Sequence, residues 1–352
     1  MLVGAGALAR PAEEVRALMD GRRVFVVASR PVAELHPRAL ESLLEPAAAS
    51  EIITVADGEA AKRPAVAADL WERLLAAGGK RDSLVVAFGG GSIGDLGGFV
   101  AATFLRGIDL VQAPTTLLAQ VDAAIGGKTG VNLPAAKNSV GVFHQPIAVI
   151  SDTALLASLP RPELRSGLVE AVKMAALLDL ELLALIERDL PALLAGDAER
   201  LTPVVAAAAA AKARVVERDP HEAGHRKLLN FGHTLGHAIE AAAGYRGLGH
   251  GDAVGWGIRF ALRLAARRGL PPEDRERLER LLDRLELPAL PPVSANDLIG
   301  HLRHDKKARE GGTAWVLPRR LGEGEVVEDV PAGEVAAELD GFLAASTGEK
   351  AL

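Results

Sequence analysis

The sequence predicts two different halves, an α/β half with a parallel sheet followed by an all-helical half. Up to about residue 150, short runs rich in β-branched residues alternate with stretches of helical periodicity. This alternation is typical of a parallel sheet covered by helices on both faces. A single hydrophobic core stops growing near about 250–300 residues, so a chain of 352 residues has room for two domains. We therefore expect an α/β domain over residues 1–158 and an α-helical domain over 159–352.

The first half contains five predicted strands and two predicted helices. The strands cover residues 23–28, 51–55, 83–88, 109–113 and 147–150, and the helices cover 31–44 and 63–77. Rossmann-like sheets of this kind bind ligands beyond the carboxyl ends of their strands. The residues that follow the strands are therefore the first candidates for a binding site.

The second half is predicted to be almost wholly helical. Its helices cover residues 163–177, 181–194, 201–216, 233–243, 253–268 and 272–285. The proline-rich stretch at 287–292 is a predicted loop, and we expect the last residues, 346–352, to be loose. No internal repeat is present.

The composition excludes several classes of protein. A hydrophobic content of 49% with 24% charged residues is ordinary for a soluble globular protein. The net charge of -6 argues against a nucleic-acid partner. Because the chain has no cysteine, a bound metal must use histidine, carboxylate or water ligands. The apolar start, residues 1–7, is too short for a signal peptide, and no apolar run reaches the ~20 residues that span a bilayer. We expect a cytoplasmic protein that does not bind membranes.

A glycine-rich turn follows the predicted strand 83–88. Residues 89–94 read Gly-Gly-Gly-Ser-Ile-Gly and are followed by an apolar helical pattern. Glycines at this place let backbone N–H groups approach a pyrophosphate at the start of a helix. The acidic residue that usually lies about 20 positions further on is missing, because 113–116 reads Ala-Pro-Thr-Thr. The turn predicts nucleotide binding by the first domain, and a purely structural turn is the alternative.

A second glycine-rich stretch, 126–138, carries basic side chains. Gly127-Lys128-Thr129 is similar to the end of a P-loop, but Asp122 stands where the first glycine of that motif belongs. Lys128, Lys137 and Asn138 suit an anionic substrate, and an ordinary solvated loop is the alternative.

Three side chains in separate segments have the composition of a catalytic metal site. They are Glu170, His233 and His250. Two imidazoles and a carboxylate leave a tetrahedral zinc with an open fourth position, which catalysis requires. His237 lies on the same helical face as His233, so spacing alone does not decide which of the two binds metal. Glu222, Glu240 and Asp252 compete with Glu170 for the carboxylate position. The nearby basic residues Lys212, Arg226 and Lys227 could bind an anion, and the alternative is that they are simply solvated.

Taken together, the motifs resemble those of the 3-dehydroquinate synthases over about residues 24–322. The segments that carry the resemblance are 89–96 (Gly-Gly-Gly-Ser-Ile-Gly-Asp-Leu), 104–107 (Phe-Leu-Arg-Gly), 114–122 (Pro-Thr-Thr-Leu-Leu-Ala-Gln-Val-Asp), 126–132 (Gly-Gly-Lys-Thr-Gly-Val-Asn), 137–138 (Lys-Asn), 229–240 (Leu-Asn-Phe-Gly-His-Thr-Leu-Gly-His-Ala-Ile-Glu), 250–252 (His-Gly-Asp) and 305–307 (Asp-Lys-Lys). The resemblance implies an α/β NAD-binding domain and a helical metal- and substrate-binding domain, with the active site in the cleft between them. It also implies a homodimer.

The activity implied by the resemblance is that of a carbon–oxygen lyase of the shikimate pathway, which leads to the aromatic amino acids. Such an enzyme converts 3-deoxy-D-arabino-heptulosonate 7-phosphate into 3-dehydroquinate and phosphate with NAD and a divalent metal, zinc or in its place cobalt. The steps are oxidation of an alcohol, elimination of phosphate, reduction, ring opening and aldol cyclisation.

The resemblance also assigns roles to individual residues. It implies Glu170, His233 and His250 as metal ligands and His237, Glu222, Lys128 and Lys173 as catalytic residues, with His237 in proton transfer. It implies substrate contacts by Arg106, Asp122, Lys128, Asn138, Lys173, Lys212, Arg226, Asn230, His237 and one of Lys306 or Lys307, with Arg106 reaching the phosphate from a neighbouring subunit. The implied cofactor contacts are Glu59, Lys62, Gly90, Gly91, Ser92, Asp95, Thr115, Thr116, Asp122, Lys137, Leu155 and Ser158.

The sequence departs from the family pattern in a few places, and other functions stay open. Ala28-Ser29-Arg30 stands where the family commonly has an aspartate for the adenosine ribose, so NADP remains an alternative to NAD. Ser92 and Ser158 replace the more usual valine and threonine. The competing functions are another sugar phosphate cyclase, a metal-dependent polyol dehydrogenase, and an inactive relative that serves as a scaffold. The intact set Lys128, Glu170, Lys173 and His237 disfavours the scaffold.

Overall fold

The computed structural model describes residues 1–9, 12–134, 136–306, 314–328 and 330–346. Contacts within the chain divide it into two compact units. The first comprises Met1–Leu164 and Ala192–Val216, and the second comprises Arg165–Pro191 and Glu217–Leu352. The expected division after residue 158 concerns domains as functional parts and stays a prediction.

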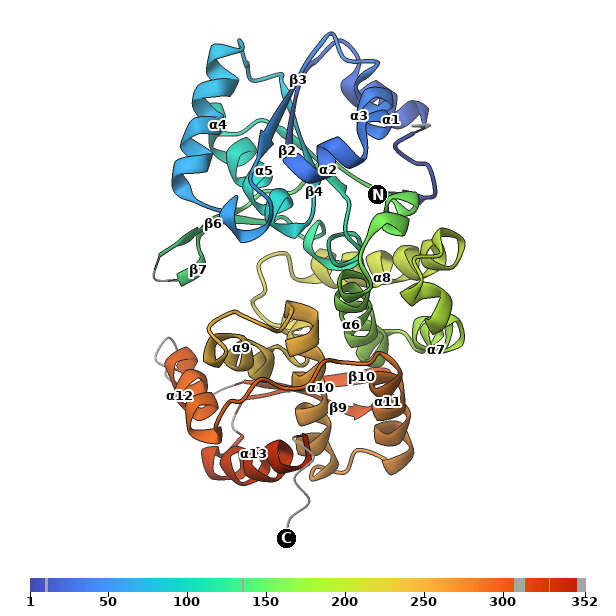
Figure 1. Cartoon of the computed structure of the whole chain (residues 1–352), viewed down its shortest axis with the longest axis vertical. Helices are drawn as coiled ribbons and strands as arrows, with labels where there is room; N and C mark the ends of the chain where they lie inside the picture. Colours follow the sequence, from blue (N-terminus) through green and yellow to red (C-terminus); the bar gives the residue numbers. More distant parts are fainter. Residues whose placement is uncertain (10–11, 135, 307–313, 329, 347–352) are drawn as a thin grey trace. The chain divides into compact units, whose positions relative to one another are not determined.

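A six-stranded sheet forms the centre of the first unit (Figure 1). Its strands are β1 (Leu2–Gly4), β2 (Arg23–Ser29), β3 (Ala49–Val55), β4 (Leu84–Gly89), β5 (Asp109–Pro114) and β8 (Ala148–Asp152). They lie in the order β1-β8-β5-β4-β2-β3, and every pairing between neighbours is parallel. This confirms the predicted α/β class and its five strands, and adds the short strand β1.

Helices cover both faces of this sheet. They are α1 (Glu13–Met19), α2 (Arg30–Leu35), α3 (Pro37–Leu44), α4 (Pro64–Ala76) and α5 (Gly91–Thr103). Along β2, Phe25 and Val27 join the core under α4 and α5, whereas Val24 and Val26 join the core under α1 and α3. Because side chains alternate along a strand and both faces are covered, the central strands are apolar at nearly every position. Figure 1 shows α4 and α5 on one side of the sheet and α1 and α3 on the other.

One predicted helix of the first half is broken. Residues 31–44 form two helices, α2 and α3, that meet at His36, whose φ of -125° and ψ of 48° are not helical. The cause is Pro37, since a proline disfavours the helical conformation of the residue before it.

The stretch 126–138, for which we considered a solvated loop, instead belongs mostly to an antiparallel hairpin. Its strands are β6 (Lys128–Leu133) and β7 (Ala136–Phe143), and all eight residues of β7 are exposed. Gly130 and Gly141 face each other across the pair, and a Cβ on Gly130 would lie 2.7 Å from the Val140 carbonyl oxygen. The glycines therefore allow the two backbones to approach closely.

The second unit is mainly helical, as predicted. Its helices are α6 (Arg161–Leu178), α7 (Leu180–Leu194), α9 (His233–Ala242), α10 (His250–Ala266), α11 (Pro272–Arg284), α12 (Ala295–Lys306) and α13 (Ala332–Ser346), and α8 (Ala198–Arg218) lies almost entirely in the first unit. The second unit also contains an antiparallel hairpin that the sequence reading missed, formed by β9 (Trp315–Arg320) and β10 (Glu323–Val327). The expected all-helical half is therefore mainly, but not wholly, helical.

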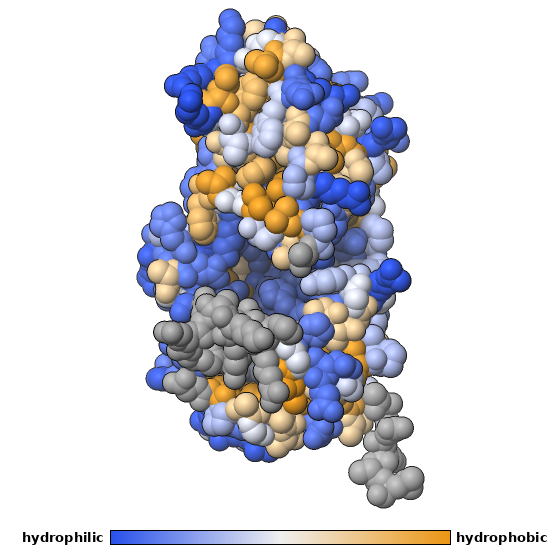
Figure 2. Space-filling view, turned by 90° about the vertical axis from the view of Figure 1, so that its left-hand side faces the viewer, coloured by the Kyte–Doolittle hydropathy of each residue, from blue (hydrophilic) through white to orange (hydrophobic). Residues whose placement is uncertain are grey.

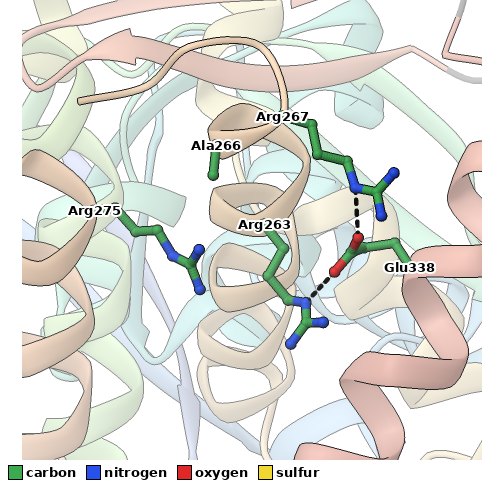
Figure 3. Close-up of a pocket in the computed structure, with 5 residues that line it drawn as sticks. All are labelled: Arg263, Ala266, Arg267, Arg275 and Glu338. Atoms are coloured by element: carbon green, nitrogen blue, oxygen red, sulfur yellow. Dashed lines mark hydrogen bonds and ion pairs between the residues drawn. The ribbon is translucent and has the colours of Figure 1, made fainter. Parts of the chain in front are cut away.

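Aromatic and charged contacts hold the centre of the second unit together. Phe260 of α10 packs against Trp315 of β9 and Phe342 of α13, with ring centroids 5.3 and 5.4 Å apart. A pocket of about 330 Å³ is lined by Arg263, Ala266, Arg267, Arg275 and Glu338, and Figure 3 shows these side chains. The buried Glu338 carboxylate receives hydrogen bonds from the Nε atoms of Arg263 and Arg267, which ties α13 to α10. None of the expected site residues lines this cavity.

Among the described residues, no helix combines the length and the apolar composition needed to cross a bilayer. Figure 2 shows hydrophilic side chains over much of the visible face, interrupted by separate hydrophobic patches.

Candidate active site and metal centre

The three side chains that were expected to bind metal meet within the second unit. Glu170 projects from α6, while His233 and His250 are the first residues of α9 and α10. One ligand atom from each lies within 4.8 Å of the other two. The Nε2 atoms of His233 and His250 are 3.7 and 3.4 Å from Oε1 of Glu170. Segments about 60 and 80 positions apart in sequence thus converge on one point.

Glycines allow the helices that carry these ligands to pack closely. Gly232, which precedes His233, has a φ of +80°, and a Cβ there would lie 2.6 Å from the Val254 carbonyl oxygen of α10. A Cβ on Gly257 of α10 would lie 1.9 Å from the Gly232 carbonyl oxygen. A Cβ on Gly251 would lie 2.4 Å from the carbonyl oxygen of Ser166 on α6. Larger residues at these positions would separate the helices and the ligands with them.

A buried lysine accompanies the buried carboxylate. Glu170 is 1% exposed and Lys173, one turn later on α6, is 2% exposed. The ammonium group of Lys173 pairs with Oε2 of Glu170, while Oε1 is the atom that faces the two imidazoles. Lys173 therefore balances the charge of Glu170 and holds its carboxylate in one orientation.

The two imidazoles have opposite pKa shifts. Burial, followed by the charge of Lys173, lowers the pKa of His233 to about 3, so its ring is neutral near pH 7. Burial would also lower the pKa of His250, but hydrogen bonds to Glu170 and Glu240 outweigh burial and raise that pKa to about 10. A neutral imidazole is the form that binds a metal, so metal binding requires His250 to lose its extra proton.

A second group of possible ligands shares His250 with the first. His237, Glu240 and His250 also bring one ligand atom each within 4.8 Å of one another. The rings of His233, His237 and His250 form a cluster, with centroids 5.3 to 5.9 Å apart. His237 is exposed, whereas Glu170 is buried. The group that contains the buried Glu170 is the ligand set that the resemblance implied.

The other competing carboxylates have partners elsewhere. Asp252 receives hydrogen bonds from Nε and Nη2 of Arg165, at 2.6 and 3.1 Å. The amide of Asn230 donates to Oε1 of Glu222 at 2.9 Å. Among the described residues, neither carboxylate belongs to a group of possible metal ligands.

Arg226 is buried rather than solvated, and it contacts the loop that leads from Asp219 to Arg226 itself. It is 2% exposed, lies in the 3-10 helix η5 (His225–Asn230), and donates from Nη1 to the Pro220 carbonyl oxygen. The Asp219 carboxylate accepts hydrogen bonds from the backbone N–H groups of Ala223, Gly224 and Arg226. The bond from Gly224, followed by that from Arg226, lowers the pKa of Asp219 to about 2.

The glycine turn of the first unit lies where the sequence predicted it. Gly89 ends β4, Gly90 caps α5, and α5 begins at Gly91. A Cβ on Gly90 would lie 3.1 Å from Cγ2 of Thr116, and one on Gly91 would lie 3.2 Å from Cβ of Ala123. The buried Thr115 hydroxyl, after β5, has no hydrogen-bond partner among the described residues. A helix start with closely packed glycines and an unused hydroxyl fits a phosphate-containing ligand.

Polar side chains form a chain beside this turn. Lys62 is 3% exposed and donates to Oδ2 of Asp95 at 2.6 Å and to Oδ1 of Asn138. Burial raises the pKa of Asp95, and the charge of Lys62 opposes that effect. Glu59 continues the chain, since it accepts hydrogen bonds from Ser92 and from Asn132. The structure thus brings together Lys62, Asp95, Glu59 and Ser92, all expected cofactor residues.

The remaining expected residues are distributed over the two units. Lys212 of α8 pairs with Asp122. Lys128 and Lys137 are exposed on the hairpin, and Arg106 has a φ of +69° in the turn before β5. Leu155 is buried in η4 (Thr153–Ser158), where the Ser158 hydroxyl donates to the Leu155 carbonyl oxygen. Lys306 is the last residue of α12, and Lys307 lies outside the described residues.

Sequence reasoning missed one anchoring residue and classified another too narrowly. Asp219 was not considered, although Asp219-Pro220 followed by Gly224 is typical of an aspartate that binds the N–H groups of its own loop. Glu240 was weighed only as a metal ligand, because the sequence does not show which nitrogen of His250 it contacts.

One unit is a parallel α/β fold with a glycine turn, and the other is mainly helical and carries a His–His–Glu group. Together they are typical of metal-dependent enzymes that have a Rossmann-like nucleotide-binding domain. Comparison with known proteins identifies the family. The family model described as 3-dehydroquinate synthase N-terminal matches residues 52–166, and that described as 3-dehydroquinate synthase C-terminal matches residues 167–308. The chain belongs to the 3-dehydroquinate synthase family.

Individual relatives agree with this assignment. The 3-dehydroquinate synthase of Symbiobacterium thermophilum is 48% identical over 334 residues, 93% of each chain. That of Azotobacter vinelandii is 46% identical and covers 96% of this chain and 92% of its own length. Among solved structures, 2-epi-5-epi-valiolone synthase from Streptomyces hygroscopicus, with NAD+ and Zn2+ bound, has a TM-score of 0.88 at 29% identity, covering 98% of this chain and 96% of its own. A 2-deoxy-scyllo-inosose synthase complexed with carbaglucose-6-phosphate, NAD+ and Co2+ has a TM-score of 0.87 at 26% identity, with 96% of each chain covered.

Proposed function

We propose that this enzyme is a 3-dehydroquinate synthase, which converts 3-deoxy-D-arabino-heptulosonate 7-phosphate into 3-dehydroquinate and phosphate. The observation that carries the proposal is the convergence of the buried Glu170 with the half-buried His233 and His250 beside Lys173. It occurs in a chain that aligns with named synthases over more than nine-tenths of its length. This activity belongs to the shikimate pathway, and the cytoplasm is the proposed location.

Zinc is the metal that we propose for this group, with cobalt as a substitute. Two imidazole nitrogens and one carboxylate oxygen suit either ion and leave a coordination position for a substrate oxygen. The two solved relatives hold Zn2+ and Co2+ respectively, which supports the choice.

NAD is the proposed cofactor of the first unit. Both solved relatives hold NAD+, and the start of α5 carries glycines at Gly90 and Gly91, where a side chain would crowd Thr116 and Ala123. The proposed contacts are the expected set around this turn, namely Glu59, Lys62, Gly90, Gly91, Ser92, Asp95, Thr115, Thr116, Asp122, Lys137, Leu155 and Ser158. When bound, the metal polarises the substrate alcohol, while the nicotinamide accepts a hydride and returns it within the same turnover.

The chain's own residues bind the anionic substrate and move its protons. His237 is exposed beside the ligand histidines, which suits a group that exchanges protons with substrate and solvent. Arg226 is proposed to bind the substrate carboxylate, since a guanidinium holds a carboxylate through two parallel hydrogen bonds. Asn230 and Glu222, joined by a hydrogen bond, and Lys173 are further proposed contacts from this unit, together with one of Lys306 or Lys307. Asn138, Lys128 and Lys212, with Asp122, are the proposed contacts from the first.

Arg226 separates the proposed function from that of another sugar phosphate cyclase. Losing one partner of a buried charge pair costs about 2–5 kcal/mol, so Arg226→Ala is expected to lower kcat/KM for the heptulosonate by roughly 30-fold or more. Sedoheptulose 7-phosphate, which has no carboxylate, should be a very poor substrate of the unmodified enzyme. Equal rates on the two sugars would favour a different cyclase.

A homodimer is the proposed assembly, with Arg106 reaching the phosphate in the neighbouring subunit. Strand β7 supports self-association, because it is exposed along its whole length and carries Val140 and Val142, which are 39% and 42% exposed. Exposed apolar patches often mark interaction surfaces. Sedimentation measures the oligomeric state of the unmodified protein and of Val142→Asp. A monomeric unmodified protein would contradict the proposed homodimer.

A further inference from the structure

We propose that Glu240 is a positioning residue of the metal centre, which accepts a hydrogen bond from the Nδ1–H group of His250 and so directs Nε2 of that ring to the metal. The inference rests on the proposed metal site of Glu170, His233 and His250. It adds a residue outside the ligand set and decides between the two overlapping groups of possible ligands.

The contacts of His250 lie on opposite sides of its ring. Nδ1 is 3.1 Å from Oε2 of Glu240, and Nε2 is 3.4 Å from Oε1 of Glu170. A neutral imidazole has one N–H donor and one nitrogen with a free lone pair, and an ionised carboxylate only accepts hydrogen bonds. When Glu240 holds the proton on Nδ1, the lone pair of His250 is on Nε2. That atom faces the same carboxylate oxygen as His233 does.

His233 has the same arrangement with a different acceptor. Its Nδ1 is 3.3 Å from the Phe231 carbonyl oxygen, and its Nε2 is 3.7 Å from Oε1 of Glu170. Both ligand histidines therefore present Nδ1 to an oxygen acceptor and Nε2 to Glu170. Histidines that bind metals commonly donate their second N–H to a carbonyl or carboxylate, which fixes the tautomer and the ring orientation. Glu240 supplies for His250 what the backbone supplies for His233.

The alternative is that Glu240 binds the metal itself, together with His237 and His250. This group would use the other side of His250. The Glu240 side chain is 12% exposed, whereas that of Glu170 is 1% exposed. His237, the other member of this group, is an exposed residue. In addition, Glu170 faces two Nε2 atoms with one oxygen and is oriented by Lys173 through the other. The group whose carboxylate is buried and oriented is the better metal site, which leaves Glu240 as its support.

The position of Glu240 in α9 explains how one helix serves both roles. Glu240 follows His233 by seven residues, and positions seven apart lie on one face of a helix. Helix α9 thus provides the ligand His233 and the residue that orients the ligand His250 of α10. Any shift of α9 along α10 would disturb both.

The test measures zinc affinity by competition with a chromophoric chelator, without reference to catalysis. Glu240→Ala is expected to weaken zinc binding by about 10- to 100-fold, and Glu240→Gln, whose amide oxygen still accepts from Nδ1, should lose less. The control is Glu276→Gln, which changes an exposed carboxylate of α11 paired with Arg280 and should leave the affinity unchanged. Circular dichroism of each variant checks that it is folded.

Cobalt spectra distinguish an orienting residue from a ligand. With Co2+ bound, the visible absorption of Glu240→Gln should keep the band shape of the unmodified protein, whereas Glu170→Gln should change it. Zinc affinity of Glu240→Ala within threefold of the unmodified protein, or a lost ligand in the cobalt spectrum of Glu240→Gln with Glu170→Gln unchanged, would overturn the inference. An unmodified protein that binds no zinc would instead contradict the proposed function.

Discussion

At the scale of single residues, the sequence predicted the position of the proposed ligand histidines but not the orientation of their rings. Spacing predicted that His233 and His237 share a helical face, and the structure confirms that both lie on α9. It could not predict that His233 points Nε2 toward Glu170, because that depends on how α6 and α10 pack against α9. Likewise, the sequence allowed Arg226 to be a solvated basic residue, yet it is buried and bonded to Asp219 and Pro220.

The metal ligands give the first prediction. Glu170→Ala, His233→Ala and His250→Ala should each lose bound zinc and turnover while the fold is retained, since each removes one of three ligands. His237→Ala should keep its zinc and lose turnover, because its proposed task is proton transfer. Metal analysis of the purified variants measures this. Zinc lost from His237→Ala but kept by His250→Ala would reverse the assignment.

Asp219 gives a second prediction, about the position of Arg226. Asp219→Asn places an NH2 group among three backbone donors and removes a charge-assisted hydrogen bond to the Arg226 backbone. Because Asp219 then holds the Arg226 backbone less firmly, kcat/KM for the heptulosonate should fall by roughly tenfold. Steady-state kinetics of Asp219→Asn, Arg226→Ala and the double variant provide the test. Full additivity of the two effects would show that Asp219 does not act through Arg226.

The same carboxylate gives a third prediction, about stability and pH. Backbone hydrogen bonds lower the pKa of Asp219 to about 2 in the folded protein. The pKa of an aspartate in an unfolded chain is about 3.9. The contribution of Asp219 to stability is therefore complete above that unfolded value and is lost as the pH falls toward 2. The difference in urea midpoint between the unmodified protein and Asp219→Asn should be constant above about pH 5 and shrink in acid. A difference that grows in acid would contradict the direction of the shift.

At the scale of elements, long apolar strands and periodic helices were predictable, and short exposed strands were not. The buried strands β2, β4 and β5 are runs of apolar residues that the structure places at the centre of the sheet. Strand β7 is exposed at every position and so lacks the alternation of apolar and polar residues that marks a half-buried strand. The first four residues of β9 are buried, and Trp315 packs against Phe260 of α10. This contact joins residues far apart in the chain, so the local sequence does not reveal it.

Helix packing at the metal centre gives the fourth prediction. Gly257→Ala would place a Cβ 1.9 Å from the Gly232 carbonyl oxygen and push α9 away from α10. Overpacking of this kind costs about 1–3 kcal/mol, and zinc affinity should fall with it because His233 follows Gly232. Gly300→Ala, in the exposed part of α12 where nothing lies within 4 Å of the new methyl, is the matched control and should be neutral or slightly stabilising. Thermal unfolding and zinc titration compare the two, and equal behaviour would argue against close packing as the reason for Gly257.

At the scale of the whole molecule, the sequence predicted both classes of structure but not the path of the chain. The α/β part and the mainly helical part are confirmed. Helix α8 belongs to the first unit although it lies beyond residue 190, and its Lys212 reaches Asp122 there. Local sequence patterns do not show that the chain returns to the first unit at α8, because this return depends on contacts between residues 90 positions apart.

The central claim is that metal, nicotinamide and substrate carboxylate act together in one synthase. It is tested by incubating the zinc-loaded protein with 3-deoxy-D-arabino-heptulosonate 7-phosphate and a small, catalytic amount of NAD. The account predicts that phosphate and 3-dehydroquinate form in equal amounts over many turnovers, with no net NADH at the reduced-cofactor absorbance. NADH that accumulates in proportion to product, with no phosphate released, would contradict the account and indicate a dehydrogenase.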